Sequence, residues 1–494
     1  MDVKLGAEEK PGDKTGPLVN SPLSPEESLQ HLRLHPDLKL EIAAAEPDVI
    51  DPVAVRFDEL GQMWVVEMID YPLGPKSADE KPKSRIRLLK DEDQNGRYEA
   101  STIFADELLF VTGILPWKEG VIATLSGEVA YFKDTNQDGK ADVKETWFTG
   151  FAEQNTQLRA NHPQFGLDNK VYISNGLRGG EVQNVNPAWT AQAKSVPLSL
   201  RGKDFRFDPL TGAYEAVAGN GQFGLTIDSN GSRYICSNRN PCMQVLLEDH
   251  YLQRNPQLIV PSTVNDVSPA GADSRVYAIT RAWTTSNLHA GQFTAACGVH
   301  RYEGSLLPEE FQGNSFTCEP TGNLVHRDVF TPAGASFTSH YGREQVEFLA
   351  SEDEWFRPVN VQTGPDGALY ICDMYRAVIE HPEWVPDELK NRPDERYGDD
   401  KGRLYRVVPK GQQNSGLSLT IDRDDSQSLL QALVSPNSWH RTTAARIIYE
   451  EQLTSLVPEL KNLLSSSENT VGIVQVLHTL AGLKVLTAED PGCI

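Results

Sequence analysis

One stretch of the sequence has the residue types and the spacing of a calcium-binding loop. It reads DTNQDGKADVKE and covers residues 134–145. Oxygen-bearing side chains recur along it and a glycine stands at its sixth position, which is the pattern that a hard, oxygen-seeking cation needs. The predicted metal-binding set is Asp134, Asn136, Asp138, Lys140, Asp142 and Glu145.

The flanks of this loop argue against a complete EF-hand. Strand-like sequence, VAYFK before it and TWF after it, stands where an EF-hand has helices. A poorer copy, DEDQNG at 91–96, is followed by Thr102 where the last glutamate is expected. Calcium binding at 134–145 is one prediction, and a solvated Asp/Asn/Gly hairpin turn is the alternative.

The elements that must position this loop belong to a repeat. An apolar strand, a turn with Asp and often Gly, and a strand with an aromatic residue recur six times between about 36 and 410. Clear copies are VAVRFDELGQMWVVEM, FGLDNKVYISNG, FGLTIDSNGSRYICSN and VQTGPDGALYICDMY. Weaker copies begin at 117 and 291, and the second strand of the latter is expected near 297. Strands at such intervals, with turn residues between them, predict an all-β, six-bladed β-propeller.

The composition divides the chain into four parts. Residues 1–35 are a polar segment that ends in a short helix, and 36–410 form the propeller. A polar linker covers 411–424, and the apolar period of 425–494 is helical. The paired helices there resemble HEAT-type, armadillo-like repeats, and we expect an incomplete array because only about two pairs fit. Long inserted loops are expected at 72–83, 176–200, 250–290 and 376–401.

Basic side chains stand in loops that follow corresponding strands of several copies. In a propeller such loops converge on one face, around the central channel. The predicted cofactor-binding set is Arg178, Arg239, His289, Arg376 and His381. These groups would make a locally positive pocket, suited to an anionic cofactor such as a tricarboxylated quinone or to an acidic sugar. The alternative is that the arginines pair with Asp228, Asp373 and similar neighbours and so lock the blades together.

Composition excludes several classes of function. Lys plus Arg is 46 and Asp plus Glu is 69, so the net charge is −23, which repels nucleic acids and anionic lipid surfaces. No apolar run is long enough to cross a bilayer, and residues 1–23 lack the apolar core of a secretory signal. No C-x-x-C or C-x-x-C-H is present, so we expect no haem within this chain. Cys297 with Cys318, and Cys236 with Cys242, could form disulfides or remain buried thiols.

Longer strings carry a family resemblance. GPDGALYICDMY and GRLYRVV resemble the last blade of glucose/sorbosone dehydrogenase-type propellers. DPVAVRFDELGQMWVVEMIDYP, RAWTTSNLHAGQFTAACG and DMYRAVIEHPEW are similar to the membrane-bound dehydrogenase family of Pirellula and Verrucomicrobium type, over roughly 24–410 and into the helical repeats. The resemblance implies a periplasmic or extracellular location and a quinone such as pyrroloquinoline quinone (PQQ). It also implies electron transfer to a cytochrome c-type haem partner or domain that these residues do not contain.

The resemblance also implies a catalytic base. In glucose/sorbosone dehydrogenases a histidine before a strand F-G-x-D-G-x-L-Y-V takes the substrate hydroxyl proton while hydride passes to the quinone. His162, in the motif Arg159-Ala-Asn-His-Pro before FGLDNKVYI, stands at the similar place, so His162 and Arg159 are the predicted catalytic residues. The glycine pair usual between histidine and strand is missing here, and the spacing is shorter. A loop histidine that bonds a neighbouring blade is the alternative.

Two functions follow from these observations. The first is a quinoprotein-like oxidoreductase that oxidises the hydroxyl of a sugar or alcohol, with Ca²⁺ as a further cofactor. The second is a non-catalytic propeller that binds carbohydrate or protein. In that case Trp283, Trp355 and Trp384 would stack on sugar rings.

Overall fold

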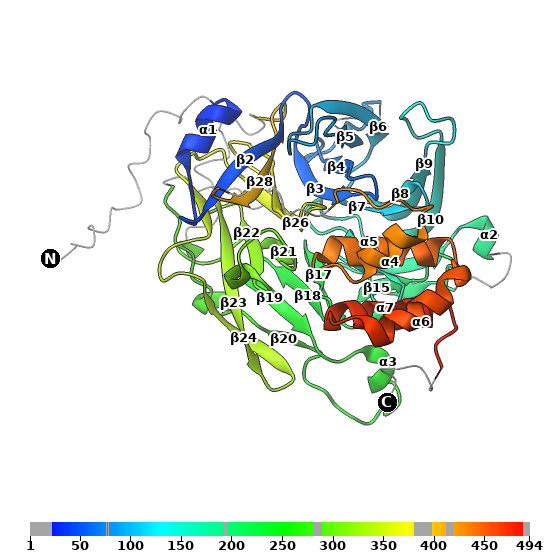
Figure 1. Cartoon of the computed structure of the whole chain (residues 1–494). Helices are drawn as coiled ribbons and strands as arrows, with labels where there is room; N and C mark the ends of the chain where they lie inside the picture. Colours follow the sequence, from blue (N-terminus) through cyan, green and yellow to red (C-terminus); the bar gives the residue numbers. More distant parts are fainter. Residues whose placement is uncertain are drawn as a thin grey trace.

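The computed structural model describes residues 22–75, 77, 79–190, 196–280, 289–379, 398–411 and 418–487. In these residues the strands form six sheets of antiparallel strands, four with four strands and two with six. The sheets follow one another along the chain and lie side by side around a centre (Figure 1). The six-bladed β-propeller predicted from the repeat is therefore confirmed.

The first three blades cover the N-terminal half of the propeller. Blade 1 contains β3 (Pro52–Phe57), β4 (Met63–Glu67), β5 (Ser84–Lys90) and β6 (Ala100–Leu108). Blade 2 contains β7 (Gly113–Trp117), β8 (Gly120–Leu125), β9 (Glu128–Lys133) and β10 (Val143–Phe151), extended by β13 (Gly180–Asn184) and β14 (Leu198–Ser199). Blade 3 contains β11 (Asn161–Phe165), β12 (Val171–Ser174), β15 (Asp204–Phe207) and β16 (Tyr214–Val217).

The other three blades include strands from both ends of the propeller segment. Blade 4 contains β17 (Leu225–Ile227), β18 (Arg233–Ser237), β19 (Asn240–Val245) and β20 (Val264–Asp266). Blade 5 contains β21 (Cys297–Arg301), β22 (Ser315–Glu319), β23 (Leu324–Ala333) and β25 (Leu349–Ser351), with β24 (Ser336–Tyr341) and β1 (Leu32–Leu34). Blade 6 contains β26 (Pro358–Thr363), β27 (Leu369–Asp373), β28 (Arg403–Pro409) and β2 (Leu38–Ala45).

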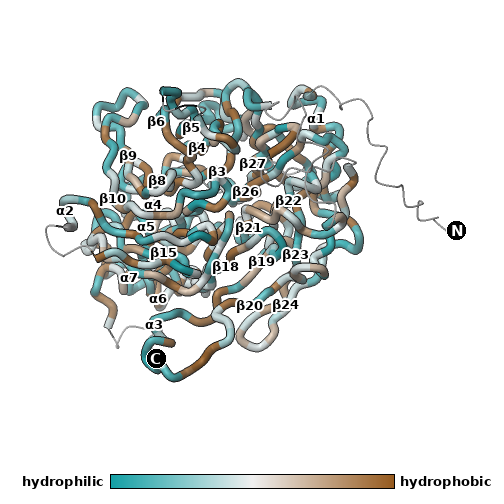
Figure 2. The backbone as a smooth tube through the Cα atoms, turned by 180° about the vertical axis from the view of Figure 1, so that it is seen from behind, coloured by the Kyte–Doolittle hydropathy of each residue, from teal (hydrophilic) through white to brown (hydrophobic). Residues whose placement is uncertain are grey.

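One strand of each blade lies next to the centre. β3, β7, β11, β17, β21 and β26 each contact the next inner strand, and β26 contacts β3, so the six close a ring. Strands such as β3, β4 and β8 are buried along their whole length, because neighbouring blades cover both faces of each sheet. In Figure 2 the hydrophobic stretches lie mostly in the interior, and the loop between α3 (Asp249–Leu252) and β20 is an exception.

Two details of the predicted repeat were wrong. Cys297, expected in a second strand, begins the inner strand β21, and the second strand is β22. The expected loop at 176–200 holds β13 and β14, which add to the outer edge of blade 2. Each error has a local cause: a bulge interrupts β21 after Cys297, and β13 and β14 are short strands at a sheet edge, so neither region shows a clear alternating period.

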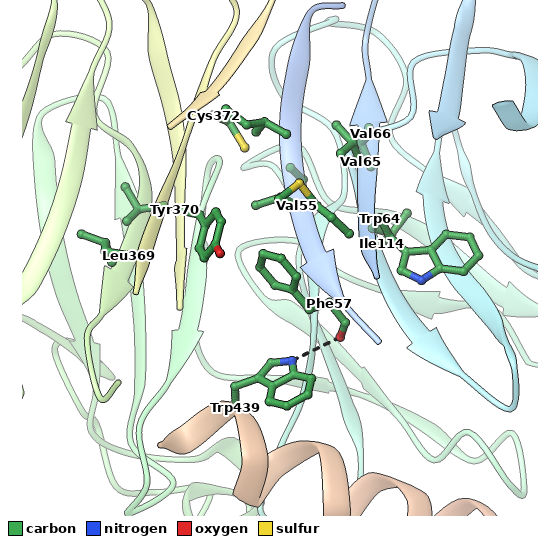
Figure 3. Packing of buried hydrophobic residues seen from close by; sticks show 14 of the residues in the cluster. Val55, Phe57, Trp64, Val65, Val66, Ile114, Leu369, Tyr370, Cys372 and Trp439 are labelled. Carbon is green, nitrogen blue, oxygen red and sulfur yellow. Dashed lines mark hydrogen bonds between the residues drawn. The ribbon is translucent and has the colours of Figure 1, made fainter. Parts of the chain in front are cut away.

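Helices follow the propeller and pack on it. They are α4 (Ser426–Leu433), α5 (Ser438–Glu450), α6 (Val457–Ser466) and α7 (Thr470–Gly482), and α5 contacts both α4 and α7. Trp439 lies against the end of β3, where its Nε1 donates to the Phe57 carbonyl at 3.3 Å (Figure 3). The helices and blade 1 therefore share one hydrophobic core. The HEAT-type assignment and the domain boundaries stay predictions.

Among the helices of the described residues, none combines the length and the apolar character that crossing a membrane requires.

Trp439→Ala should destabilise the protein by about 3–5 kcal/mol, because it leaves a cavity at the junction of α5 and blade 1. The free energy of unfolding in urea measures the loss. Gln431→Ala, at an exposed position of α4, is the matched control. Equal stability of the two variants would show that the helices and the propeller do not share a core in solution.

Candidate functional site

Two cavities lie at opposite ends of the channel that the inner strands surround. The first, which we call the start-side cavity, has a volume of about 120 Å³ and lies where the inner strands begin, beside Val53, Cys297 and Val359. The second, the helix-side cavity, has a volume of about 100 Å³ and lies where the inner strands end, beside Arg56 and His300. Residues of α5 and α7 also line the helix-side cavity.

The start-side cavity combines apolar surface with neutral hydrogen-bonding groups. Met68, Phe223 and Met374 are among its apolar lining. Its side-chain amides form hydrogen bonds with one another or with a hydroxyl: Gln222 Nε2 donates to Asn238 Oδ1 at 2.8 Å, and Gln157 Nε2 donates to the Tyr71 hydroxyl at 2.9 Å. The buried hydroxyl oxygen of Thr156 has no hydrogen-bond partner. This lining suits a small ligand with hydroxyl groups on an apolar frame.

His162 lies behind the wall of the start-side cavity. It is 3% exposed and lines neither cavity, and the Phe223 ring, which does line one, stands edge-on to it with centroids 4.7 Å apart. The backbone of His162 has φ +51° at a bulge in β11. The chain is close to β7 here, since a Cβ added at Gly113 would lie 2.8 Å from the backbone nitrogen of His162. A left-handed residue at a bulge re-aims its side chain, and such strain is common at functional sites.

The hydrogen bonds of His162 define its tautomer. Asn161 Oδ1 accepts from the Gly224 nitrogen, so it also accepts from His162 Nδ1 at 2.8 Å. The other ring nitrogen, Nε2, then accepts from Asn360 Nδ2 at 2.6 Å. Burial, with Arg56 nearby, lowers the pKa of His162 well below its ordinary value, so the ring is neutral. A neutral imidazole with a lone pair on Nε2 has the chemistry of a base.

Arg159, the other predicted catalytic residue, forms hydrogen bonds and a ring contact with neighbouring residues of the protein. Its guanidinium donates to the Glu153 carbonyl at 3.0 Å and to the Ser126 hydroxyl, and it stacks on Phe110 at 4.6 Å. It is 5% exposed and does not line the start-side cavity. Its contacts are those of a residue that joins blades 2 and 3.

None of the described members of the predicted cofactor-binding set lines the start-side cavity. Arg376 is fully buried and pairs with Asp51, and it also donates to the Tyr71 carbonyl at 2.6 Å. This is the blade-locking role, with Asp51 rather than Asp373 as the partner. Arg178 is exposed. Arg376 and Arg178 therefore do not face a common ligand.

Arg239 and His289 do lie in one neighbourhood. Arg239 follows Asn238 of the start-side cavity and donates to Gln292 Oε1 at 2.7 Å, and the Gln292 nitrogen donates to the His289 carbonyl at 2.9 Å. His381 lies outside the described residues, as do Trp283 and Trp384. Trp355 is buried against Tyr375, so it offers no open face to a sugar.

The predicted calcium loop is folded as a turn. Asp134 accepts the backbone N–H of Gln137 and Gly139, both at 2.7 Å, and Asp142 accepts that of Thr135. Glu145 lies in β10, where it accepts from the Trp147 indole at 3.2 Å. In the poorer copy at 91–96 and the residues after it, three carboxylates form a cluster: oxygens of Asp91, Asp93 and Glu99 lie within 4.8 Å of one another. The motif analysis overlooked Glu99, which stands at the ninth position of that loop and adds a third carboxylate to the cluster.

The cysteines of the described residues are free and buried. Cys297 faces Cys318 across β21 and β22. Burial raises the pKa of the Cys236 thiol to about 12, and the pKa values of the other four are raised as well. In this state they are inert apolar side chains rather than nucleophiles.

A family model described as a domain of unknown function, DUF7133, matches residues 24–411. The chain belongs to the DUF7133 family. No curated protein sequence matches it. The DUF7133 match covers all six blades and ends at the turn after β28.

Solved propellers with similar structures include several sugar dehydrogenases. The PQQ domain of pyranose dehydrogenase from Coprinopsis cinerea has a TM-score of 0.43 and 12% identity, and the match covers 76% of this chain and 97% of that one. The soluble aldose sugar dehydrogenase of Escherichia coli has a TM-score of 0.40 and 15% identity, and the match covers 76% of this chain and 100% of that one. The PQQ-bound aldose sugar dehydrogenase of Streptomyces coelicolor has a TM-score of 0.37 and 13% identity, and the match covers 76% of this chain and 100% of that one. Likeness at this level does not transfer a ligand or a reaction to the DUF7133 chain.

The pH dependence of stability should report the buried histidines. Burial beside Arg56 lowers the pKa of His300 to about 3, whereas an unfolded histidine titrates near 6.5. Below that pH the unfolded state takes up a proton and the folded state does not, so His300 costs stability as the pH falls. The stability gap between the wild type and His300→Gln should change by about 1.4 kcal/mol per pH unit between pH 6 and 5, in favour of the variant.

Urea unfolding at each pH measures this gap, with His340→Gln as the matched control because His340 is exposed on β24. A gap that stays constant with pH would mean that His300 is protonated in the folded protein.

Proposed function

We propose that the start-side cavity binds a neutral sugar or alcohol through its hydroxyl groups. The observation that carries the proposal is the unpaired, buried hydroxyl of Thr156 in a cavity whose other polar groups are amides and hydroxyls. A buried polar group without a partner costs free energy, and a ligand hydroxyl would remove that cost. The apolar floor around Phe223 would cover the carbon frame of the ligand.

The described lining of this cavity does not fit a tricarboxylated quinone. It includes no Arg or Lys that could balance three carboxylates. Arg159 and Arg376, which could have balanced the carboxylates, are committed elsewhere. PQQ therefore stays a prediction from the resemblance.

Oxidation of the bound hydroxyl is the second candidate function. It is favoured by His162, whose imidazole is neutral and whose Nε2 lone pair accepts a hydrogen bond from the Asn360 amide. The Phe223 ring stands between His162 and the cavity. With Phe223 and Asn360 displaced by substrate, His162 would accept the hydroxyl proton at Nε2. The hydride of the same carbon would have to pass to a separate electron acceptor, and the resemblance implies an acceptor of quinone type followed by a cytochrome c-type partner.

Three further predictions belong to this proposal. Ca²⁺ at 134–145 is supported by the turn that Asp134 builds, and the 91–99 loop is a second place for it. The HEAT-like character of α4 to α7 is supported by the packing of α5 between α4 and α7. The periplasmic or extracellular location follows from the resemblance alone.

Thr156→Val should weaken the binding of the best sugar or alcohol about two- to tenfold, because it removes one hydrogen-bonding group at nearly constant shape. Isothermal titration across a panel of sugars and alcohols measures the affinity. The same change should leave the melting temperature unchanged or higher, since the hydroxyl has no partner in the unliganded protein. Thr338→Val, at an exposed position of β24, is the control. Equal affinities of the two variants would contradict the proposed site.

His162→Gln should lower the rate of dye-linked oxidation by about 10²- to 10⁴-fold if His162 is the base. The assay contains the same panel of compounds with PQQ and Ca²⁺ added, and titration checks that binding is retained within a few-fold. His340→Gln is again the control. Saturable binding with no turnover in the wild type would identify the protein as a binding propeller rather than an enzyme.

A further inference from the structure

The helix-side cavity contains a buried cation without a carboxylate partner. Arg56, at the end of β3, is 7% exposed and lines this cavity. Its NH1 donates to its neighbour's carbonyl and to Gln362 Oε1, both at 2.9 Å, and its Nε has no partner. In the described part of the chain, no Asp or Glu forms an ion pair with Arg56. The sequence signal was one arginine inside the apolar run VAVRF.

The other charged groups of this cavity are already satisfied. Asp228 pairs with Arg301 at 3.7 Å and accepts two backbone N–H groups of its own turn. Glu303 accepts from the Ser229 nitrogen and hydroxyl, at 2.9 and 2.6 Å. Arg446 of α5 pairs with carboxylates on both sides. Arg56 thus differs from the other cationic groups that line the cavity.

Neutral donors stand beside Arg56 in the same cavity. His300, whose Nε2 bonds the Thr363 hydroxyl at 2.8 Å, lines it together with Gln362. An ionised group buried without a counter-charge is strongly unfavourable, and a guanidinium is matched best by the paired oxygens of a carboxylate or phosphate. The neighbouring histidines are neutral, because burial and the charge of Arg56 lower their pKa values, so Arg56 is the cationic group at this point of the channel.

We propose that the helix-side cavity is a binding site for a small oxyanion, with Arg56 as its counter-ion and His300 and Gln362 beside it. The ligand class is a tetrahedral inorganic oxyanion or a short carboxylate, because a cavity of about 100 Å³ has room for several water-sized groups. Thr442 of α5 is exposed and lines the cavity, so the site reaches solvent between α5 and blade 4. The proposal is independent of the sugar site at the other end of the channel.

The test is isothermal titration of the whole chain with phosphate, sulfate and acetate in turn, in a dilute Tris buffer whose chloride concentration is kept well below that of the added anion. We expect saturable binding of at least one of them at one site per chain. Arg56→Gln should weaken it about tenfold to a hundredfold, because one charge-assisted hydrogen bond or pair is lost. Arg254→Gln, which removes an exposed arginine far along the chain, should bind like the wild type.

Thermal melting separates this site from a purely structural role of Arg56. Without oxyanion, Arg56→Gln should melt at the same temperature as the wild type or higher, because it removes an uncompensated buried charge. With rising oxyanion, only the wild type should gain stability. A structural arginine would instead give a variant that melts lower under both conditions, which would overturn the proposal.

Other outcomes also decide the matter. No saturable heat with any of the three anions, or equal affinity of Arg56→Gln and wild type, would overturn it. Binding that chloride abolishes at equal concentration would identify a halide site instead and would overturn the oxyanion assignment. If Arg56→Gln does not fold, Arg56→Lys decides: affinity at least about tenfold weaker supports a paired-oxygen ligand, and unchanged affinity contradicts it.

Discussion

The pairing of β2 with β28 is the interaction on which the rest of the structure depends. It joins the beginning of the propeller segment to its end, with Leu38 opposite Pro409 and Ala45 opposite Arg403. An open row of six sheets would expose the buried faces of its first and last blades to water. The shared blade removes these faces, and it brings β26 against β3. The channel, and with it both cavities, exists only because the ring is closed in this way.

Buried ion pairs mark the same seam. Arg403 pairs with Glu46 at 3.0 Å, and Arg376 pairs with Asp51, so each pair joins residues more than three hundred positions apart. Ion pairs this deep contribute little net free energy, because desolvation offsets the attraction, but either charge alone would be costly. They therefore favour the one register in which both pairs form. Arg376, a candidate for cofactor binding by its place in the sequence, serves this closure instead.

The sequence was sufficient to predict the architecture and insufficient to predict the sites. Blade number followed from a repeated strand–turn–strand pattern, because every blade buries the same two strands and turns between them with the same residues. Arg56 and His300 escaped notice because a sequence pattern does not show which strand ends meet across a channel. The role of Arg376 depended on Asp51, a residue distant in the chain. His162 was found by resemblance, yet its cover by Phe223 and its bond to Asn360 required coordinates.

The distribution of charge separates the two ends of the channel. The chain carries a net charge of −23, but His162, His300 and Arg56 lie along the channel without a carboxylate pairing with Arg56 in the described residues. A neutral hydroxylated ligand suits the start side, where the histidine is uncharged. An anion suits the helix side, where the guanidinium is. Residues of α5 and α7 cover part of that second cavity, so these helices help to bury the guanidinium that needs a partner.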